Sequence, residues 1–186
     1  EKLFGLELTP RCKVIRTIIA ELARIQDHLL CVGCAGLDLG GFTAFMYPFN
    51  AREVIYDLFE EICGARFTTS YTRVGGLMQD ITPEWPAKVR HFCEEVVPPV
   101  LDDVERLLTR NRIFIERTKG IGYLGHDDAI DWGMTGPLAR ASGVRRDLRK
   151  DEPYLCYADN WDGKGSSAVD FKVHISHGGD SYARYQ

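Results

Sequence analysis

The sequence predicts a mainly α-helical fold, and the periodicity of its apolar residues carries that prediction. Between residues 14 and 29, apolar side chains recur at spacings of three and four, which is the pattern of one buried face on a helix of about 20 residues. The same spacing returns in 54–62 and in 89–108. With 186 residues, 45% of them hydrophobic, the chain is long enough for a sizeable core, and we expect one domain over residues 1–186.

The first two helices have recognisable ends. The first begins after the Thr9 cap, with proline in its first position, and extends to about Ala35, before a glycine weakens it. The second is expected to begin at Asn50, because a glutamate three residues later gives the spacing of a capping box, and to end at Gly64. Residues 65–81 alternate β-branched or aromatic residues with polar ones, which predicts extended segments or an irregular loop.

The second half of the chain predicts shorter elements. A helical region starts near Thr82, and the proline pair 98–99 is expected to bend it or split it in two. A short helix is expected within 127–133. Residues 170–175 alternate like a strand, and a glycine pair follows them, so we expect a small β-hairpin over 170–185.

Composition excludes some classes of function. The net charge is −4, and basic residues form no run that stands clear of acids, so nucleic-acid binding is not expected. No apolar run reaches the roughly 18 residues of a membrane span, and no signal-peptide pattern is visible. The six cysteines are scattered, so we interpret them as reduced thiols in a cytosolic setting. The first residue is not methionine, and the chain is expected to be part of something longer.

One carboxylate, Asp38, stands out in the almost wholly apolar stretch 28–49. An unpaired buried carboxylate is costly, or its pKa rises. Two interpretations follow from the residues alone. The carboxylate hydrogen-bonds loop amides near a helix end, or it is a functional acid held in apolar surroundings.

Two pairs of metal-binding residue types have plainer explanations. Cys31 and Cys34 have the spacing of half a zinc site, but no second such pair exists, and we interpret both as small core residues. His174 and His177 would point to opposite faces of a strand, so we interpret them as surface or turn residues.

Two arginine-rich stretches remain open. Arg140 begins a basic run that is interleaved with acids, which favours neighbouring ion pairs; the alternative is that Arg140 faces a partner subunit or a cofactor. In the other stretch, Arg66, Tyr71 and Arg73 precede the glycine pair 75–76, which is typical of a close backbone approach.

Taken together, several segments resemble a known family, the quinone-site subunit of respiratory complex I, also called the D-type or 49-kDa subunit of NADH-quinone oxidoreductase (NADH dehydrogenase). The most specific are RASGVRRDLRKDEPY and the RVGG loop. The segments are 10–30, 37–66, 70–81, 111–122, 136–154 and 179–185.

The resemblance implies a fold, an activity and a place in the cell. The fold is the helical-bundle core of the NiFe-hydrogenase large subunit, without its nickel site and with small β elements. The chain would be a central part of a longer subunit that forms one wall of the quinone-reduction pocket in a proton-pumping NADH-quinone oxidoreductase. It would lie peripherally on the cytoplasmic face of the inner (cell) membrane, would hold no metal or cofactor itself, and would be inactive alone.

The resemblance also implies partners and site residues. The partners are the subunit that carries the terminal 4Fe–4S cluster, a C-type subunit, the membrane-arm subunit of the quinone channel, and quinone. Asp38 matches the acid that pairs with a quinone-site histidine upstream of this segment, and would take part in proton delivery. Arg66 matches an arginine beside the cluster, whose charge favours the reduced cluster. Residues placed in the quinone pocket or near the cluster are Arg66, Thr68, Tyr71, Arg73 and Arg140.

One position departs from the family pattern. Where many members have histidine after Ala-Arg-Met, this chain has Thr68. We therefore expect the proton-coupled tuning of the cluster to be absent or supplied otherwise, with a lower cluster potential suited to menaquinone. Two other identities stay open: the large subunit of a membrane-bound NiFe hydrogenase, and a non-catalytic helical scaffold. The segments 73–76 and 147–150 favour complex I over the hydrogenase.

Overall fold

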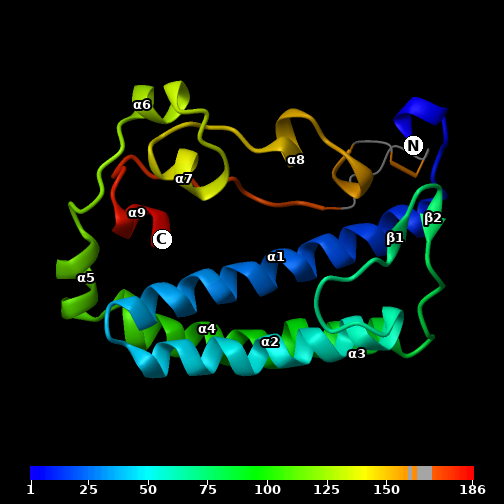
Figure 1. The fold of residues 1–186 in the computed structure, drawn as a ribbon, viewed down its shortest axis with the longest axis horizontal. Helices are drawn as coiled ribbons and strands as arrows, with labels where there is room; N and C mark the ends of the chain where they lie inside the picture. Colours follow the sequence, from blue (N-terminus) through cyan, green and yellow to red (C-terminus); the bar gives the residue numbers. More distant parts are fainter. Residues whose placement is uncertain (159–160, 163–168) are drawn as a thin grey trace. The chain divides into compact units, whose positions relative to one another are not determined.

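The computed structural model describes residues 1–158, 161–162 and 169–186, and the chain is mainly helical. It divides into two compact units, Glu1–Arg110 and Asn111–Gln186. The single domain expected over residues 1–186 stays a prediction, because the structure gives two compact units and not their arrangement relative to each other. Figure 1 shows the order of the elements along the chain.

Two long antiparallel helices form the centre of the first unit, α1 (Pro10–Asp38) and α2 (Phe42–Cys63). The Thr9 side chain accepts a hydrogen bond from the Cys12 amide, so the predicted cap of α1 is confirmed. The helices bury their apolar stripes against each other, and the sequence period of three to four is the reason. The core contains Ile15, Ile19, Leu22, Leu29, Ala51, Ile55, Leu58, Phe59, Ile62, Tyr71, Trp85 and Phe92.

The expected start of the second helix at Asn50 is wrong. α2 begins eight residues earlier, at Phe42, and contains Pro48 in its interior. Pro48 is fully buried, and its neighbour Ala44 is only 2% exposed, so this end of α2 is part of the packed interface with α1. The burial of that face outweighs the backbone hydrogen bond that the proline cannot donate. Asn50 is an exposed residue inside the helix.

Short helices complete the first unit. After α3 (Trp85–His91) comes a π-helical segment, Phe92–Val96, and then α4 (Val97–Val104) and a second π-helical segment, Glu105–Thr109. The proline pair does not split the helix in two: residues 85–109 are helical throughout, and the local change is the π-helical segment that precedes α4. Both prolines lie in the first turn of α4, and neither can donate a backbone hydrogen bond. A 3₁₀ turn, Lys2–Phe4, lies at the other end of the chain.

The β structure lies elsewhere than the sequence predicts. The strands β1 (Thr72–Arg73) and β2 (Gly76–Leu77) form an antiparallel hairpin inside 65–81, where extended segments were one of two expectations. The hairpin expected over 170–185 is wrong: the described residues 169–180 form no strand, and Ser181–Tyr185 is the helix α9. Asp180 is the reason, because its carboxylate accepts hydrogen bonds from the Ala183 and Gly120 amides and so caps α9.

The second unit is built from short helices and turns. Phe114 and Tyr185 stack edge to face at 4.8 Å, which packs α9 on α5. The expected short helix near 127–133 is confirmed as α6. The helices are α5 (Arg112–Thr118), α6 (His126–Asp131), α7 (Gly136–Ala141), α8 (Leu148–Asp151) and a 3₁₀ turn, Leu155–Tyr157. Among the described residues, none of the helices is both long and apolar enough to cross a membrane.

Candidate functional site

Asp38 is the last residue of α1, and its side chain is exposed rather than buried. Within the described part of the chain its carboxylate has no hydrogen bond and no ion pair, so the interpretation that it bonds loop amides is wrong. An apolar sequence neighbourhood does not bury it, because the neighbouring Leu37 and Phe42 are themselves 37% and 60% exposed. The carboxylate is therefore open to a group from outside the described residues.

Close packing positions the turn that carries Asp38. A side chain at Gly36 would lie 3.2 Å from the Ala44 methyl group and 3.4 Å from Leu108, so only glycine lets α1 and α2 approach this closely. The Gly41 amide donates to the Gly36 carbonyl at 2.7 Å and closes the turn. Gly36 and Gly41 thus fix the geometry of the turn that follows α1.

The turn also carries an exposed apolar surface, which we call the turn patch. Its residues are Leu37, Phe42, Met46 and Tyr47, each at least 37% exposed. Large apolar side chains that remain exposed together mark a surface that contacts another molecule. Asp38 directly follows Leu37, one of the residues of this patch, in the chain.

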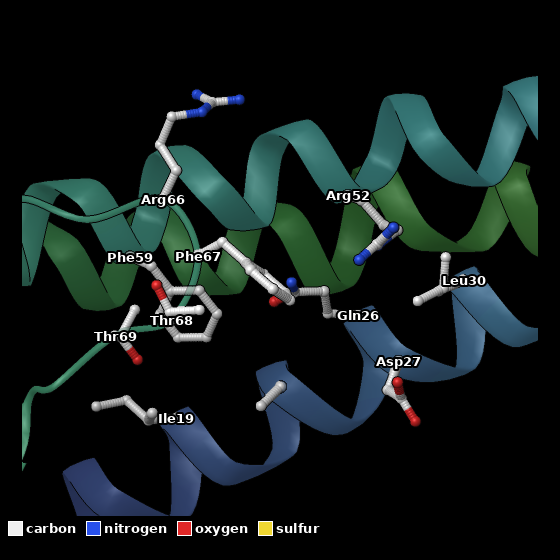
Figure 2. Close-up of a pocket in the computed structure, with 11 residues that line it drawn as sticks. Ile19, Gln26, Asp27, Leu30, Arg52, Phe59, Arg66, Phe67, Thr68 and Thr69 are labelled. Atoms are coloured by element: carbon white, nitrogen blue, oxygen red, sulfur yellow. The ribbon is translucent and has the colours of Figure 1, made fainter.

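A pocket of about 330 Å³ lies between the middle of α1, the middle of α2 and the loop that follows α2 (Figure 2). It brings together two predicted site residues, Arg66 and Thr68. Apolar side chains supply much of the wall. The lining residues are Ile19, Ala23, Gln26, Asp27, Leu30, Arg52, Phe59, Arg66, Phe67, Thr68 and Thr69.

Arg66 forms ion pairs with acidic residues in the second half of α2. Its guanidinium pairs with Glu53, lies 3.0 Å from Asp57 and 3.7 Å from Glu60, and stacks over the Tyr56 ring. The hydrogen bond to Glu53 is the main cause that raises the pKa of Arg66 above its usual range. Figure 2 shows its guanidinium pointing away from Gln26 and the centre of the pocket. The three acids give this end of α2 a net negative charge, even with Arg66 in place.

Thr68 has an unusual backbone. Its φ of 50° lies in the left-handed region, which β-branched residues rarely adopt. Its side chain is exposed at the rim of the pocket. Strain of this kind persists only where the surrounding structure imposes it, and it gathers at functional sites.

Tyr71 and Arg73 belong to the hairpin rather than to an open site. Tyr71 is 1% exposed, and its hydroxyl donates to the Gln79 carbonyl at 2.7 Å; burial is the main cause that raises its pKa. Arg73 is exposed, and its carbonyl accepts a hydrogen bond from Arg16 at 2.6 Å. Arg16 also donates to the Gly76 carbonyl at 2.8 Å, so it holds both strands of the hairpin.

Arg140 lies in the second unit and is half-buried. Its guanidinium lies 3.6 Å from the Asp147 carboxylate and donates to the Arg146 carbonyl at 3.4 Å. Arg149 pairs with the same carboxylate at 2.7 Å. Neighbouring ion pairs, the plainer interpretation of this basic run, are thus confirmed. A role for Arg140 toward a partner stays a prediction.

The predicted site residues do not form one cluster. Asp38 precedes α2 and Arg66 follows it, and α2 has 22 residues. At a rise of roughly 1.5 Å per residue, the two ends of the helix lie about 30 Å apart. The first unit therefore presents two separate candidate regions, the turn with Asp38 and the pocket with Arg66 and Thr68.

The cysteines and histidines form no metal centre in the part of the chain that the structure describes. All six cysteines are free thiols. Cys34 is half-buried, but Cys31 is exposed, so its interpretation as a core residue is wrong. His174 and His177 are exposed, as expected.

Two arginines of the site were missed by sequence reasoning. Arg16 has no distinguishing neighbour in the sequence. Arg52 had a signal: it lies three residues after Phe49 and three before Ile55, inside the apolar stripe of α2. The expected helix start at Asn50 hid this position, because a first-turn arginine would face solvent.

Comparisons with known proteins identify the family of the chain. The family model described as "Respiratory-chain NADH dehydrogenase, 49 Kd subunit" matches residues 38–186. The chain belongs to this family. Within it, the chain is 48% identical over 185 residues to a D-type subunit of NADH-quinone oxidoreductase from Opitutus terrae, and 48% identical to the D-type subunit from Methylacidiphilum infernorum. The D-type subunit from Akkermansia muciniphila is 43% identical.

Each of these matches covers the whole of this chain but only 41% or 42% of the 49-kDa family member it matches. The chain therefore spans about two fifths of the length of these relatives. The names of these relatives describe them as D-type subunits of an NADH-quinone oxidoreductase.

Proposed function

We propose that this chain is part of a peripheral-arm subunit of a proton-pumping NADH-quinone oxidoreductase, and that it forms one wall of the pocket in which quinone is reduced. The observation that carries the proposal is the match of the whole chain, at 43–48% identity, to proteins named as D-type subunits of NADH-quinone oxidoreductase. The electrons come from the terminal 4Fe–4S cluster of a partner subunit.

Asp38 is the residue of this chain that acts in the reaction. Reduction of a quinone to a quinol takes up two electrons and two protons, so the site needs groups that orient and deliver protons. An exposed carboxylate without a partner among the described residues is available to hold the imidazole of a histidine from elsewhere in the same polypeptide. By accepting a hydrogen bond from one ring nitrogen, it fixes which nitrogen faces the quinone.

The other surfaces accommodate the partners. The turn patch beside Asp38 is apolar, which suits either a quinone or the membrane-arm subunit that guides it. Arg66 and Thr68 lie near the partner that holds the cluster, and a C-type subunit packs on a further face. In this arrangement the protein lies peripherally on the cytoplasmic face of the membrane, and residues 1–186 alone reduce no quinone.

Replacement of Asp38 by Asn in the assembled complex tests the proposal. We expect the NADH:quinone reductase rate to fall by about 10²-fold or more, because a positioned acid–base group contributes that much. Electron transfer from NADH to a soluble acceptor that bypasses the quinone pocket should be unchanged. Asp102→Asn, at an exposed position of α4, is the matched control. Full quinone reductase activity in the Asp38→Asn complex would instead support a scaffold role.

A further inference from the structure

Arg52 is a buried cation without a counter-ion. It is 4% exposed, and its Nε has no hydrogen-bond partner. Its guanidinium stacks at 4.7 Å from the Phe49 ring centre and 5.4 Å from that of Tyr56, and among the described residues no carboxylate pairs with it. Aromatic faces offset only part of the cost of removing a guanidinium from water.

The other buried or half-buried arginines have charged or hydrogen-bonded partners for their guanidinium groups. Arg184 has no carboxylate partner among the described residues either, but its terminal nitrogen donates to the Gly122 and Gly179 carbonyls. Arg16 pairs with Glu1 at 2.7 Å, and Arg149 pairs with Asp147 at the same distance. Even the more exposed Arg66 has acidic partners. Among these arginines, Arg52 alone has neither a carboxylate nor a carbonyl partner within the described residues.

Arg52 lines the pocket between α1 and α2, and Figure 2 shows its side chain extending from α2 toward Gln26 and Leu30 of α1. The pocket volume of about 330 Å³ far exceeds the space that one water or one small anion fills. Its walls include apolar side chains from both helices, and Phe67 at the rim is 60% exposed. A complementary occupant would thus be mostly apolar, with one anionic group at the depth of Arg52.

We propose that the pocket binds an acidic side chain carried on an apolar segment of the same polypeptide outside residues 1–186, and that its carboxylate pairs with Arg52. The guanidinium fork fits a carboxylate through two parallel hydrogen bonds, which would satisfy the unpartnered Nε. A segment of the same polypeptide is available, because the matched relatives extend well beyond the region that this chain covers. This proposal is independent of the role of Asp38 in quinone reduction.

Photo-crosslinking in the full-length protein tests the proposal directly. The probe is p-benzoylphenylalanine in place of Phe67, a ring of similar shape at the rim of the pocket. After irradiation and digestion, mass spectrometry should identify one cross-linked peptide from outside residues 1–186, with Asp or Glu among apolar residues. A cross-link to another subunit, or none outside residues 1–186, would overturn the proposal.

The charge of Arg52 is tested in the same protein. Arg52→Gln should weaken the docking of the segment by about 30-fold, because truncating one member of a buried charge pair has an effect of this size, and the cross-link yield should fall accordingly. Arg52→Glu combined with Arg at the identified acid should restore the yield. Arg112→Gln is the control, since the side chain of Arg112 is 88% exposed. An unchanged yield in Arg52→Gln contradicts the proposal.

A soluble anion provides a further test of the proposal. If millimolar citrate raises the melting temperature of the full-length protein, and Arg52→Gln abolishes that effect, a soluble anion rather than a protein segment occupies the pocket. That result would overturn the proposal. We expect citrate to have no effect that depends on Arg52.

Discussion

The Arg149 guanidinium holds both oxygens of the Asp147 carboxylate: Nε lies 3.0 Å from Oδ1, and a terminal nitrogen lies 2.7 Å from Oδ2. The Arg149 amide also donates to Oδ1, so the same carboxylate caps α8. These hydrogen bonds lower the pKa of Asp147 from 3.8 to about 2. The RRDLRKD sequence is thus a structural ion-pair cluster within the second unit.

A pH dependence of stability follows from this pair. The folded pKa of Asp147 is lowered, so its contribution is fully present above the usual pKa of 3.8 and is lost as the pH falls through about 2. We expect Asp147→Asn to reduce the free energy of unfolding by about 2 kcal/mol at pH 6, and the difference from the original chain to shrink toward pH 2. Urea unfolding at several pH values measures it.

The control for this prediction is Asp80→Asn. The Asp80 side chain is 64% exposed and pairs with an equally exposed Arg11, so its loss should change the free energy of unfolding by about 1 kcal/mol or less. Equal effects of the two substitutions would mean that the burial of Asp147 adds nothing to the contribution of its ion pair to the free energy of unfolding.

Trp85 connects α3 to α2 through a hydrogen bond to Leu58, and its replacement tests how much this contact stabilises the fold. Its indole nitrogen donates to the Leu58 carbonyl at 2.9 Å, and the residue is fully buried. Trp85→Phe removes the indole hydrogen bond and opens a small cavity, while the Leu58 carbonyl keeps its hydrogen bond within α2. We therefore expect a loss of about 2–3 kcal/mol in the free energy of unfolding. Circular dichroism during urea denaturation measures the loss. Trp132→Phe, at a 75% exposed position, should change it little.

The helices of the first unit could be predicted because burial follows the sequence period of an amphipathic helix. α1 extends past Gly36 because that glycine packs against Ala44, a contact that no local pattern contains. Asn50 failed as a helix start for the same reason. Its capping-box spacing is a local preference, whereas the burial of Pro48 fixes the helix from Phe42 onward.

The candidate site was less predictable, because exposure depends on what covers each face. Asp38 lies in an apolar stretch, yet it is exposed because its apolar neighbours Leu37 and Phe42 are exposed as well. Arg52 has the opposite outcome: a charged residue is buried because α1 and the loop after α2 enclose it. Neither fact can be derived from the residue's own neighbours in the sequence.

The backbone of Thr68 gives a prediction about strain. At a φ of 50°, glycine avoids the clash that a β-branched side chain meets. We expect Thr68→Gly to raise the free energy of unfolding by about 1 kcal/mol, from relief of that strain. Thr72→Gly, in β1 and without a positive φ, should lower it instead. A loss of stability in both variants would show that the contacts of the Thr68 side chain stabilise the fold by more than its backbone strain destabilises it.

Thr68→His gives a prediction about electron transfer, and it rests on the proposed function. Histidine enters the left-handed region more readily than threonine, so the loop accepts it. A histidine beside the partner's cluster binds a proton more tightly when the cluster is reduced, because the added electron attracts the proton. Reduction then takes up a proton, and the midpoint potential of the cluster falls as the pH rises.

We expect the Thr68→His complex to show a slope approaching about −60 mV per pH unit between the histidine pKa values of the oxidised and reduced states, as one proton per electron requires. With threonine at this position the slope over the same range should be near zero. Redox titrations of the assembled complex, followed by electron paramagnetic resonance at pH 6, 7 and 8, measure both. A pH-dependent potential with threonine in place would mean that another group near the cluster supplies the proton, and that the departure at residue 68 does not set this property.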